Sequence, residues 1–386
     1  MKSKNRTFSY LLEGFIDCNM KINYTMYGFN ILSGGARTVL ELANKLVERG
    51  HEVTITSFKH ESELRLLKKI NFKALFKFNF APIGGSFSYR VVKRLLRGSV
   101  FYPYHYVDNR ILVKKMPECD INVGTMSFTA SAIYESGKGK PFHHAMHYEP
   151  ILSDNINIRH LIEETYYLPT VKIVNSSWLQ NAIKNYLDIE VSDENIVHPG
   201  FLNQYFFPRP EIKKNPNKKR ILSLGKKGTN KGLADILAAF RMVYEKNKNV
   251  ELVLFTGDKL INLPDDLPIV VINSPMDEEL GRLYNTADVL VCPSWLESFP
   301  APPIEAMFSG VPVVTTRFGV EDFAVNEENA LVIDPKVPQQ MANAIMRILD
   351  DSVLREKLIE NGLKTPNKFT YDAMADKVEK IFKSNI

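Results

Sequence analysis

Residues 294–307, with the sequence SWLESFPAPPIEAM, decide the predicted fold. They follow the apolar run 288–293, which predicts a buried strand. The end of this stretch and the two residues after it, 304–309, predict a short helix, and Pro303 lies near its first turn. Residues 311–316 then predict the next strand. The stretch is therefore a strand–loop–helix connection in a parallel sheet, and ligands bind such sheets beside the carboxyl ends of their strands.

Two carboxylates, Glu297 and Glu305, lie in this connection and make it a candidate ligand site. The N–H groups at the start of a helix attract phosphate. A carboxylate accepts two hydrogen bonds from a vicinal diol such as a ribose. This combination suits a nucleotide-sugar. Two solvated glutamates near a helix start are the alternative, because the helix dipole favours acidic residues there.

Length and composition describe an ordinary two-domain protein. The chain has 386 residues, of which 45% are hydrophobic and 24% charged. No apolar run approaches the ~20 residues of a membrane-spanning helix, and the N-terminus has no signal-peptide pattern. The cysteines Cys18, Cys119 and Cys292 are widely spaced, which favours a reducing compartment over a disulfide framework. We therefore expect a cytoplasmic protein.

Predicted strands and helices alternate along the chain, which is typical of an α/β protein with parallel sheets. The first unit is a strand over 21–26, a helix over 36–49 and a strand over 52–56, with Gly34 and Gly35 at the helix start. Glycines there let a ligand approach the backbone closely. Further strands are predicted over 120–125, 142–149, 171–174, 219–225, 251–258 and 268–273. Further helices are predicted over 127–135, 233–243, 277–285, 338–349, 352–361 and 371–382.

The motif E-x(7)-E formed by Glu297 and Glu305, followed by A-M-x-x-G-x-P-V-V, resembles the signature of glycosyltransferase family 4. That family contains retaining nucleotide-sugar transferases, and the resemblance covers the chain from about residue 20 to its end. It implies the GT-B fold: α/β, with two doubly wound Rossmann-like domains that face each other across a cleft. The expected organisation is an extension over 1–19, an acceptor-side domain over 20–207, a linker over 208–219, a nucleotide-sugar-binding domain over 220–368, and a helix over 369–386 that crosses back to the first domain.

The resemblance also assigns residues to the donor. The family loop G-R-x(4)-K-G is matched at Gly225, Lys231 and Gly232, but Lys226 replaces the arginine. The implied diphosphate contacts are Gly34, Gly35, Gly225, Lys226, Lys231, Ala301 and Pro302. The implied ribose contact is Glu305, and the implied donor-sugar contacts are Glu297, Ser298, Phe299 and Pro300. Pro300 stands where family members commonly have glycine, and it has no N–H to donate. The nucleobase is expected near Ile272, Asn273 and Ser274.

Catalytic contacts are implied for His147, Glu297 and Lys231, and acceptor-side contacts for Arg37, Thr125 and Glu149. The histidines His143, His144 and His147 also suggest a zinc site. That interpretation is weak, because neighbouring strand residues point to opposite faces and no fourth ligand has fitting spacing. No metal and no other cofactor is expected, since GT-B enzymes generally need none.

Residues 64–115 form an unusually basic segment. They carry twelve basic residues against Asp108 alone, a net charge of +11, with phenylalanines interleaved. Such a segment suits contact with an anionic membrane surface, so the protein could be peripheral on the inner face of the cytoplasmic membrane. A solvated basic face is the alternative. Nucleic acid is not expected as a partner, because no nucleic-acid motif accompanies the charge.

The expected function is transfer of a hexosyl or deoxyhexosyl unit, with retention, from a nucleoside-diphosphate sugar to a hydroxyl group. The acceptor would be a glycan or a lipid-linked molecule of cell-surface polysaccharide or glycoconjugate synthesis. Two alternatives remain at this point. One is a catalytically weak scaffold that binds nucleotide-sugars, and the other is a GT-B sugar-nucleotide epimerase.

Overall fold

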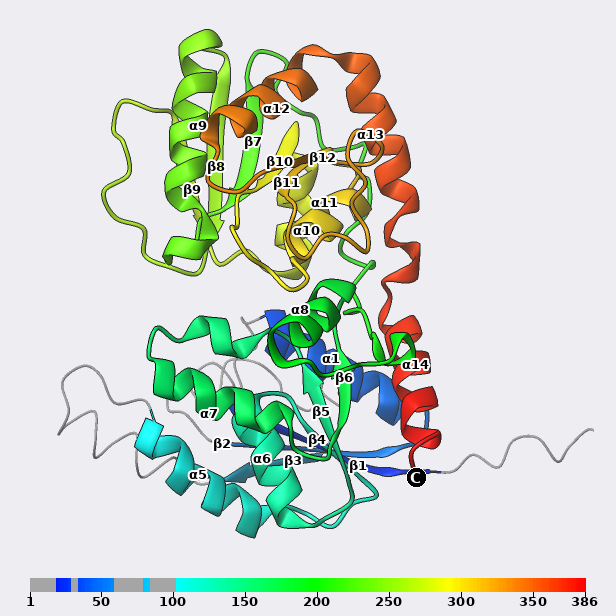
Figure 1. The fold of residues 1–386 in the computed structure, drawn as a ribbon. Helices are drawn as coiled ribbons and strands as arrows, with labels where there is room; N and C mark the ends of the chain where they lie inside the picture. The colour runs from blue at the N-terminus through cyan, green and yellow to red at the C-terminus, as the bar shows by residue number, and fades with distance from the viewer. Residues whose placement is uncertain (1–18, 29–33, 59–78, 84–101) are drawn as a thin grey trace, which may run out of the picture.

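The structure is a computed structural model that describes residues 19–28, 34–58, 79–83 and 102–386. It has two lobes, one above the other in Figure 1, and each lobe is built on a parallel sheet. The sheets have six strands each, in the orders β3-β2-β1-β4-β5-β6 and β12-β11-β10-β7-β8-β9. All neighbouring strands in both sheets pair in parallel, and the strand order reverses direction once in each sheet, so the predicted pair of doubly wound α/β domains is confirmed.

The first sheet contains β1 Lys21–Gly28, β2 Glu52–Phe58, β3 Asn79–Ile83, β4 Ile121–Gly124, β5 Lys140–Ala145 and β6 Val171–Val174. Its helices are α1 Gly34–Glu48, α5 Tyr102–Lys115, α6 Ser127–Ser136, α7 Ile156–Tyr166 and α8 Ser177–Leu187. The buried face of α1 has the spacing of an amphipathic helix, with Val39, Leu42, Ala43 and Leu46 in the core. The helix begins at Gly34, two residues before the predicted start.

The second sheet contains β7 Lys219–Leu224, β8 Val250–Thr256, β9 Ile269–Asn273, β10 Val289–Cys292, β11 Val313–Thr316 and β12 Leu331–Ile333. Its helices are α9 Leu233–Lys246, α10 Asp277–Asn285, α11 Ala301–Phe308, α12 Pro338–Asp350 and α13 Ser352–Lys364. Both faces of this sheet are covered. Leu252 and Leu254 of β8 pack in one hydrophobic core, and Val253 and Phe255 pack in the other.

Two segments connect the lobes. Phe201 and Phe206 precede the predicted 208–219 linker in sequence, yet they pack in the core beneath the second sheet. The last helix, α14 Tyr371–Lys383, leaves the second lobe and lies against the first, in red on the right of Figure 1. Its buried face, which includes Met374 and Val378, joins the core formed by β1 and α1. The two lobes are therefore held at a common edge, with a cavity between them.

Two predicted features lie wholly or largely outside the described residues. The N-terminal extension is described only at residue 19. Residues 64–78 and 84–101 of the basic segment 64–115 lie outside the described residues, and so does most of the predicted membrane-binding surface. In the parts of the chain that are described, no helix has both the length and the apolar character needed to span a membrane.

Candidate functional site

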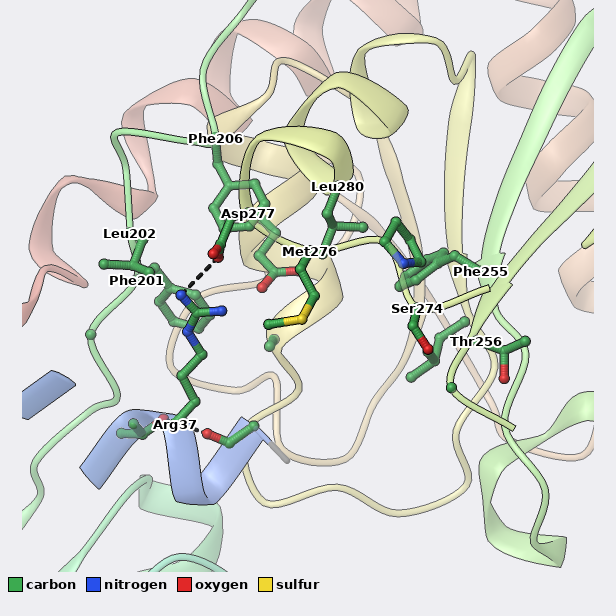
Figure 2. Close-up of a pocket in the computed structure, with 18 of the residues that line it drawn as sticks. Arg37, Phe201, Leu202, Phe206, Phe255, Thr256, Ser274, Met276, Asp277 and Leu280 are labelled. Atoms are coloured by element: carbon green, nitrogen blue, oxygen red, sulfur yellow. Dashed lines mark hydrogen bonds and ion pairs between the residues drawn. The ribbon is translucent and has the colours of Figure 1, made fainter. Parts of the chain in front are cut away.

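A cavity of about 250 Å³ lies between the two domains, at the carboxyl ends of strands from both sheets. Figure 2 shows it between α1, below, and the loops of the second domain. The segments after β1, β7, β8, β9 and β10 all border it, which is where an α/β sheet binds ligands. Of the residues predicted for the site, Gly34, Arg37, Ser274, Ala301 and Glu305 line the cavity.

Glu305 reaches the cavity from α11 and is held by one neighbour. The hydroxyl of Tyr284 on α10 donates to Glu305 Oε2 at 2.7 Å. Burial raises the pKa of Glu305 to about 7, against the opposing effects of Tyr284 and Arg37. One carboxylate oxygen is therefore fixed by the protein. The Glu305 carboxyl group can accept further hydrogen bonds from a ligand, and these would favour its ionised form.

Two helix N-termini open onto the same cavity, one from each domain. Gly34 begins α1 and Ala301 begins α11, and neither helix has an acidic residue in its first turn. Among the described residues, no atom would lie within 4 Å of a β-carbon added to Gly34 or Gly35, so these residues leave room for a ligand beside the backbone. Free N–H groups and the positive ends of two dipoles thus converge on one volume, which favours an anion.

The N-terminus of α11 can donate fewer hydrogen bonds to an anion than predicted. Its first turn contains Pro302 and Pro303, which have no N–H to donate. Pro302 also does not line the cavity, so the structure does not support its predicted contact with the diphosphate. Ala301 retains its N–H group and lines the cavity.

An ion pair crosses the cavity. A terminal guanidinium nitrogen of Arg37 on α1 lies 2.7 Å from Asp277 Oδ1, at the start of α10 in the other domain (Figure 2). Burial lowers the pKa of Arg37, but Asp277 and Glu41 raise it by more. Asp277 adopts a φ of 52°, and Ser274 nearby adopts 48°. Two non-glycine residues in the left-handed region within four positions indicate local strain beside the cavity.

The part of the cavity away from Arg37 has apolar side chains beside small polar ones. Phe255 lies there with Thr256 and Ser274 (Figure 2), and Pro275 and Met276 also line the cavity. Of the three residues predicted for a nucleobase, only Ser274 lines the cavity. Ile272 packs on a hydrophobic core and Asn273 is exposed at the end of β9. A flat, apolar ligand group fits this end, with polar contacts available from the backbone and from Ser274.

Lys231 and Glu297, predicted from separate motifs, meet in the structure. Lys231 Nζ lies 2.6 Å from Glu297 Oε1. Their loops are joined by a hydrogen bond from Trp295 N to Asn230 O at 2.8 Å. Gly232, at φ 68°, packs so closely that a β-carbon would lie 2.1 Å from the carbonyl oxygen of Pro293. Glycine is therefore required there to bring the two loops together.

The other residues of the lysine loop lie differently. Lys226 is exposed, and Gly225 is buried beside Leu254 and Leu260. Neither they nor Lys231 and Glu297 line the 250 Å³ cavity. The structure thus divides the predicted donor residues into a cavity group around Glu305 and a separate charged pair formed by Lys231 and Glu297.

His147, in the first domain, interacts electrostatically with this charged pair. Burial lowers its pKa, while the charge of Glu297 raises it and that of Lys231 lowers it further. Its Nδ1 lies 3.2 Å from the carbonyl oxygen of Tyr148, and its own carbonyl accepts a hydrogen bond from the Tyr166 hydroxyl at 3.2 Å. The contact at Nδ1 favours a proton there, which leaves the Nε2 lone pair free.

Three predicted donor-sugar residues have side chains occupied elsewhere. Ser298 is buried and donates to Asn175 of the first domain. Phe299 packs among aromatic rings, including that of His198 at 5.6 Å and that of Phe369 at 5.4 Å. Pro300 is buried at the start of α11. The side chains of these residues stabilise the loop that presents Glu297, and only their backbone remains available for a ligand.

Two predicted acceptor-side residues are structural. Thr125 is buried and donates to the carbonyl oxygen of Thr25 at 3.2 Å. Glu149 is also buried and accepts from the backbone N–H of Ser127 at 2.9 Å, at the start of α6. Burial raises the pKa of Glu149 to about 7, and the bonds from Ser127 oppose that rise. The structure therefore does not support an acceptor contact by either side chain.

The structure does not support a zinc site at these histidines. His143 and His144 on β5 are completely buried, and their ring nitrogens have no hydrogen-bond partner. Among the residues that the structure describes, no cluster of histidine, cysteine, aspartate and glutamate side chains could hold a metal ion.

The sequence did not indicate the residues that support the site. Tyr284 and Asp277 lie in the helix predicted over 277–285, and nothing in its sequence assigns either side chain to the site. Asn175 follows a strand, where polar residues usually cap the next helix. A carboxylate and an arginine on opposite domains could be matched only by their geometry, so no signal in the sequence marks the pair formed by Arg37 and Asp277.

Comparison with known proteins shows similarity to glycosyltransferases over part of the chain. Residues 206–365 match the family model of glycosyl transferases group 1. An uncharacterized glycosyltransferase of Methanocaldococcus jannaschii is 28% identical over 185 residues, which are 45% of this chain and 47% of that protein. The capsular polysaccharide biosynthesis glycosyltransferase CapM of Staphylococcus aureus is 28% identical over 163 residues, 40% of this chain and 43% of CapM. The chain thus spans less than half the length of these relatives.

Solved structures confirm the predicted GT-B fold over nearly the whole chain. Anabaena HepE, solved in complex with UDP-glucose, matches with a TM-score of 0.72 at 15% identity, over 95% of this chain and 100% of that one. WaaG, a glycosyltransferase involved in lipopolysaccharide biosynthesis, matches with a TM-score of 0.68 at 17% identity, over 94% of this chain and 99% of that one.

Proposed function

We propose that the protein is a glycosyltransferase that takes a hexosyl or deoxyhexosyl unit from a nucleoside-diphosphate sugar and transfers it to a hydroxyl group. One observation carries the proposal: two helix N-termini, from opposite domains, open onto a cavity that also contains the carboxylate of Glu305. An anion beside a diol, with an apolar group beyond, is the chemistry of a nucleoside diphosphate. The match of residues 206–365 to glycosyl transferases supports the same conclusion.

The donor is assigned along the cavity. Its base lies at the apolar end near Ser274, and its ribose hydroxyls donate to Glu305. Its diphosphate lies between the N-termini of α1 and α11, at Gly34, Gly35 and Ala301. Arg37 leaves Asp277 to bind the diphosphate, and this role replaces the acceptor-side contact expected from the sequence.

The sugar is assigned next to the charged pair. Lys231, and Lys226 from the exposed part of the loop, neutralise the diphosphate as it leaves. Glu297 contacts the sugar hydroxyls and His147 faces the same sugar from the first domain. The hydrogen bonds of Asn175 to Met146 and to Ser298, the neighbours of His147 and Glu297 in sequence, support this arrangement.

The chemical step follows from these contacts. The bond between the anomeric carbon and the phosphate oxygen breaks, and its electron pair passes to the diphosphate. The acceptor oxygen forms the new bond on the same face of the sugar, and its proton passes to the leaving phosphate. This route retains the anomeric configuration without a covalent intermediate. No metal enters the proposal, because lysines and helix dipoles supply the positive charge.

The acceptor is proposed to be a glycan or a lipid-linked molecule of polysaccharide or glycoconjugate synthesis, handled on the cytoplasmic side. CapM acts in capsular polysaccharide biosynthesis and WaaG in lipopolysaccharide biosynthesis, which supports this class. Contact of the basic 64–115 segment with anionic lipid would bring the enzyme to such an acceptor.

A donor screen tests the proposal. Thermal shifts are measured with UDP, GDP, dTDP and ADP and their sugars, followed by release of nucleotide with and without cell-envelope acceptors. A ligand at 100 times its Kd adds about 2.7 kcal/mol of stability, and at roughly 2–4 °C per kcal/mol for domains of this size the melting temperature should rise by roughly 5–11 °C. One nucleotide class should stabilise the protein and turn over with acceptor. Stabilisation without turnover would indicate a scaffold, and a changed sugar nucleotide released without acceptor would indicate an epimerase.

A further inference from the structure

The turn between β6 and α8 places one side chain between the two domains. Asn175 occupies this turn and is only 4% exposed. Its Nδ2 donates to the carbonyl oxygen of Met146 at 2.8 Å, within the first domain. Its Oδ1 accepts a hydrogen bond from Ser298 Oγ, in the second domain. A single amide group therefore joins two segments that belong to different sheets.

Those two segments carry the charged residues of the proposed reaction. Met146 directly precedes His147, and Ser298 directly follows Glu297, which pairs with Lys231. The position of His147 relative to the charged pair thus depends on the Asn175 amide. On this basis we propose that Asn175 is a positioning residue for the transfer step, which sets the separation of His147 from Glu297 and Lys231 when the domains are closed. The inference rests on the function proposed above.

The two hydrogen bonds that join the segments need an amide group at residue 175. One end of an asparagine side chain donates and the other accepts, and here both ends are used. An aspartate has no donor, so its carboxylate would face the carbonyl oxygen of Met146 and repel it. A leucine of similar size would leave that carbonyl and the Ser298 hydroxyl without their buried partner, which costs stability. Only an amide satisfies both segments at this position.

A second contact holds the same turn against the second domain. Asp322 Oδ2 accepts from the backbone N–H of Ser177 at 2.9 Å, in the first turn of α8, and lies 3.1 Å from His198 Nε2. The loop that leads to Asp322 also supports the Glu297 segment, because a β-carbon on Gly319 would lie 2.4 Å from the carbonyl oxygen of Glu297. The turn is therefore held in one position against the second domain, and Asn175 is its residue that contacts both the Met146 segment and the Ser298 segment.

The test compares Asn175→Asp with a matched control. Asn195→Asp removes a similar bond, from an asparagine amide to the carbonyl oxygen of Lys172 at 2.9 Å, but that bond lies within the first domain. Displacement of reacting groups by about 1 Å costs on the order of 100-fold in rate, so kcat of Asn175→Asp should fall roughly 10- to 100-fold. The Kd of the donor should stay within about threefold, because Asn175 does not line the nucleotide cavity.

Ser298→Ala removes the other partner of the bond. It should lower kcat in the same direction, and the double variant should be no slower than Asn175→Asp, because both changes remove one shared interaction. Asn195→Asp should keep the kcat of the wild type. An unchanged kcat in Asn175→Asp, or additive losses in the double variant, would overturn the proposal. Parallel losses of kcat, donor affinity and melting temperature would also overturn it, because they indicate a purely structural residue.

Small-angle scattering gives a readout that does not depend on turnover. If Asn175 fixes the closed arrangement, Asn175→Asp should increase the radius of gyration relative to both the wild type and Asn195→Asp. Unchanged scattering with unchanged kcat refutes the positioning role. If the wild type transfers no sugar from any donor, the proposed function fails. The scattering experiment then still tests the contact between the domains. An unchanged radius of gyration in Asn175→Asp would refute that contact's role, and an increase would uphold it.

Discussion

Replacing Glu305 with glutamine tests the proposed ribose contact most directly. Glu305 lines the cavity, and one of its oxygens already accepts from Tyr284 at 2.7 Å. Glutamine has nearly the same shape, so it preserves the packing of α11. It replaces a charged acceptor by a neutral one, and an NH₂ group can take the place of one acceptor oxygen. The substitution therefore removes the chemistry of the contact and leaves the architecture.

The expected loss follows from the two bonds to the diol. A hydrogen bond to a charged group contributes about 1.5–3 kcal/mol, and a neutral one about 0.5–1.5 kcal/mol. Conversion of two bonds from charged to neutral thus costs about 2–3 kcal/mol. At about 1.4 kcal/mol per tenfold, the Kd of the donor should rise roughly 30- to 150-fold.

Isothermal titration calorimetry at pH 8, where Glu305 is mostly ionised, measures this change. The ligand is the intact nucleoside-diphosphate sugar found in the donor screen. Glu278→Gln is the matched control, because it removes the same charge from an exposed position on α10, where Glu278 pairs with Arg209 at 2.8 Å. The control should bind like the wild type. A Kd for Glu305→Gln within about twofold of the wild type would refute the ribose assignment, since it is far below the expected loss.

The pKa of Glu305 adds a dependence on pH. Burial raises this pKa to about 7, and ribose hydroxyls donate to the ionised form. Binding should therefore tighten as pH rises from 6 to 7 and level off above 8, and it should release protons near pH 7. The intact donor is used because a terminal phosphate would itself titrate near pH 6. Glu305→Gln should lose this dependence, and an equal slope in both proteins would assign the titration to another group.

Three further changes have defined outcomes. Gly232→Ala should destabilise the second domain by more than about 1 kcal/mol in chemical denaturation, since its β-carbon would meet Pro293 at 2.1 Å. Arg37→Gln should weaken donor binding in calorimetry but change the free energy of unfolding by less than about 1 kcal/mol, because its ion pair is partly exposed. Burial lowers the pKa of His143 to about 3 and that of His144 to about 4. The unfolded chain binds more protons below pH 6.5, so the melting temperature should fall from pH 6.5 towards pH 4, and less steeply in His144→Asn.

The sequence predicted the architecture well where strands and helices had clear periodicity. Runs such as 288–293 and 251–258 were apolar and bounded by turn residues, and they are buried strands. The start of α11 at Ala301 was placed three residues late, because the two prolines made a helix seem to begin after them. No strand was predicted at β3, since the basic residues around it obscure any alternation of polar and apolar positions.

Residues within one motif were predicted better than residues in different domains. Glu297 and Glu305 lie on one connection, so their proximity to a helix start followed from spacing alone. That Lys231 and Glu297 belong to one site could be predicted only from the resemblance to a family. The family resemblance implied acceptor contacts for Thr125 and Glu149 near the ends of predicted strands, yet nearby backbone groups bind both. Position at a strand end predicts where a residue lies, but not which partner its side chain takes.

Contacts between the domains explain why the remaining part of the site was not visible in the sequence. Asn175 and Ser298 are 123 positions apart, and each has a conventional local explanation. Asparagine after a strand suggests a helix cap, but the cap of α8 is Ser176, which accepts from Leu179 N at 3.1 Å. Ser176 Oγ also donates to Asn175 Oδ1 at 3.2 Å, so the capping residue helps to orient the amide that joins the two domains. The cap must therefore be assigned to Ser176 before the amide of Asn175 can be recognised as a contact between the domains.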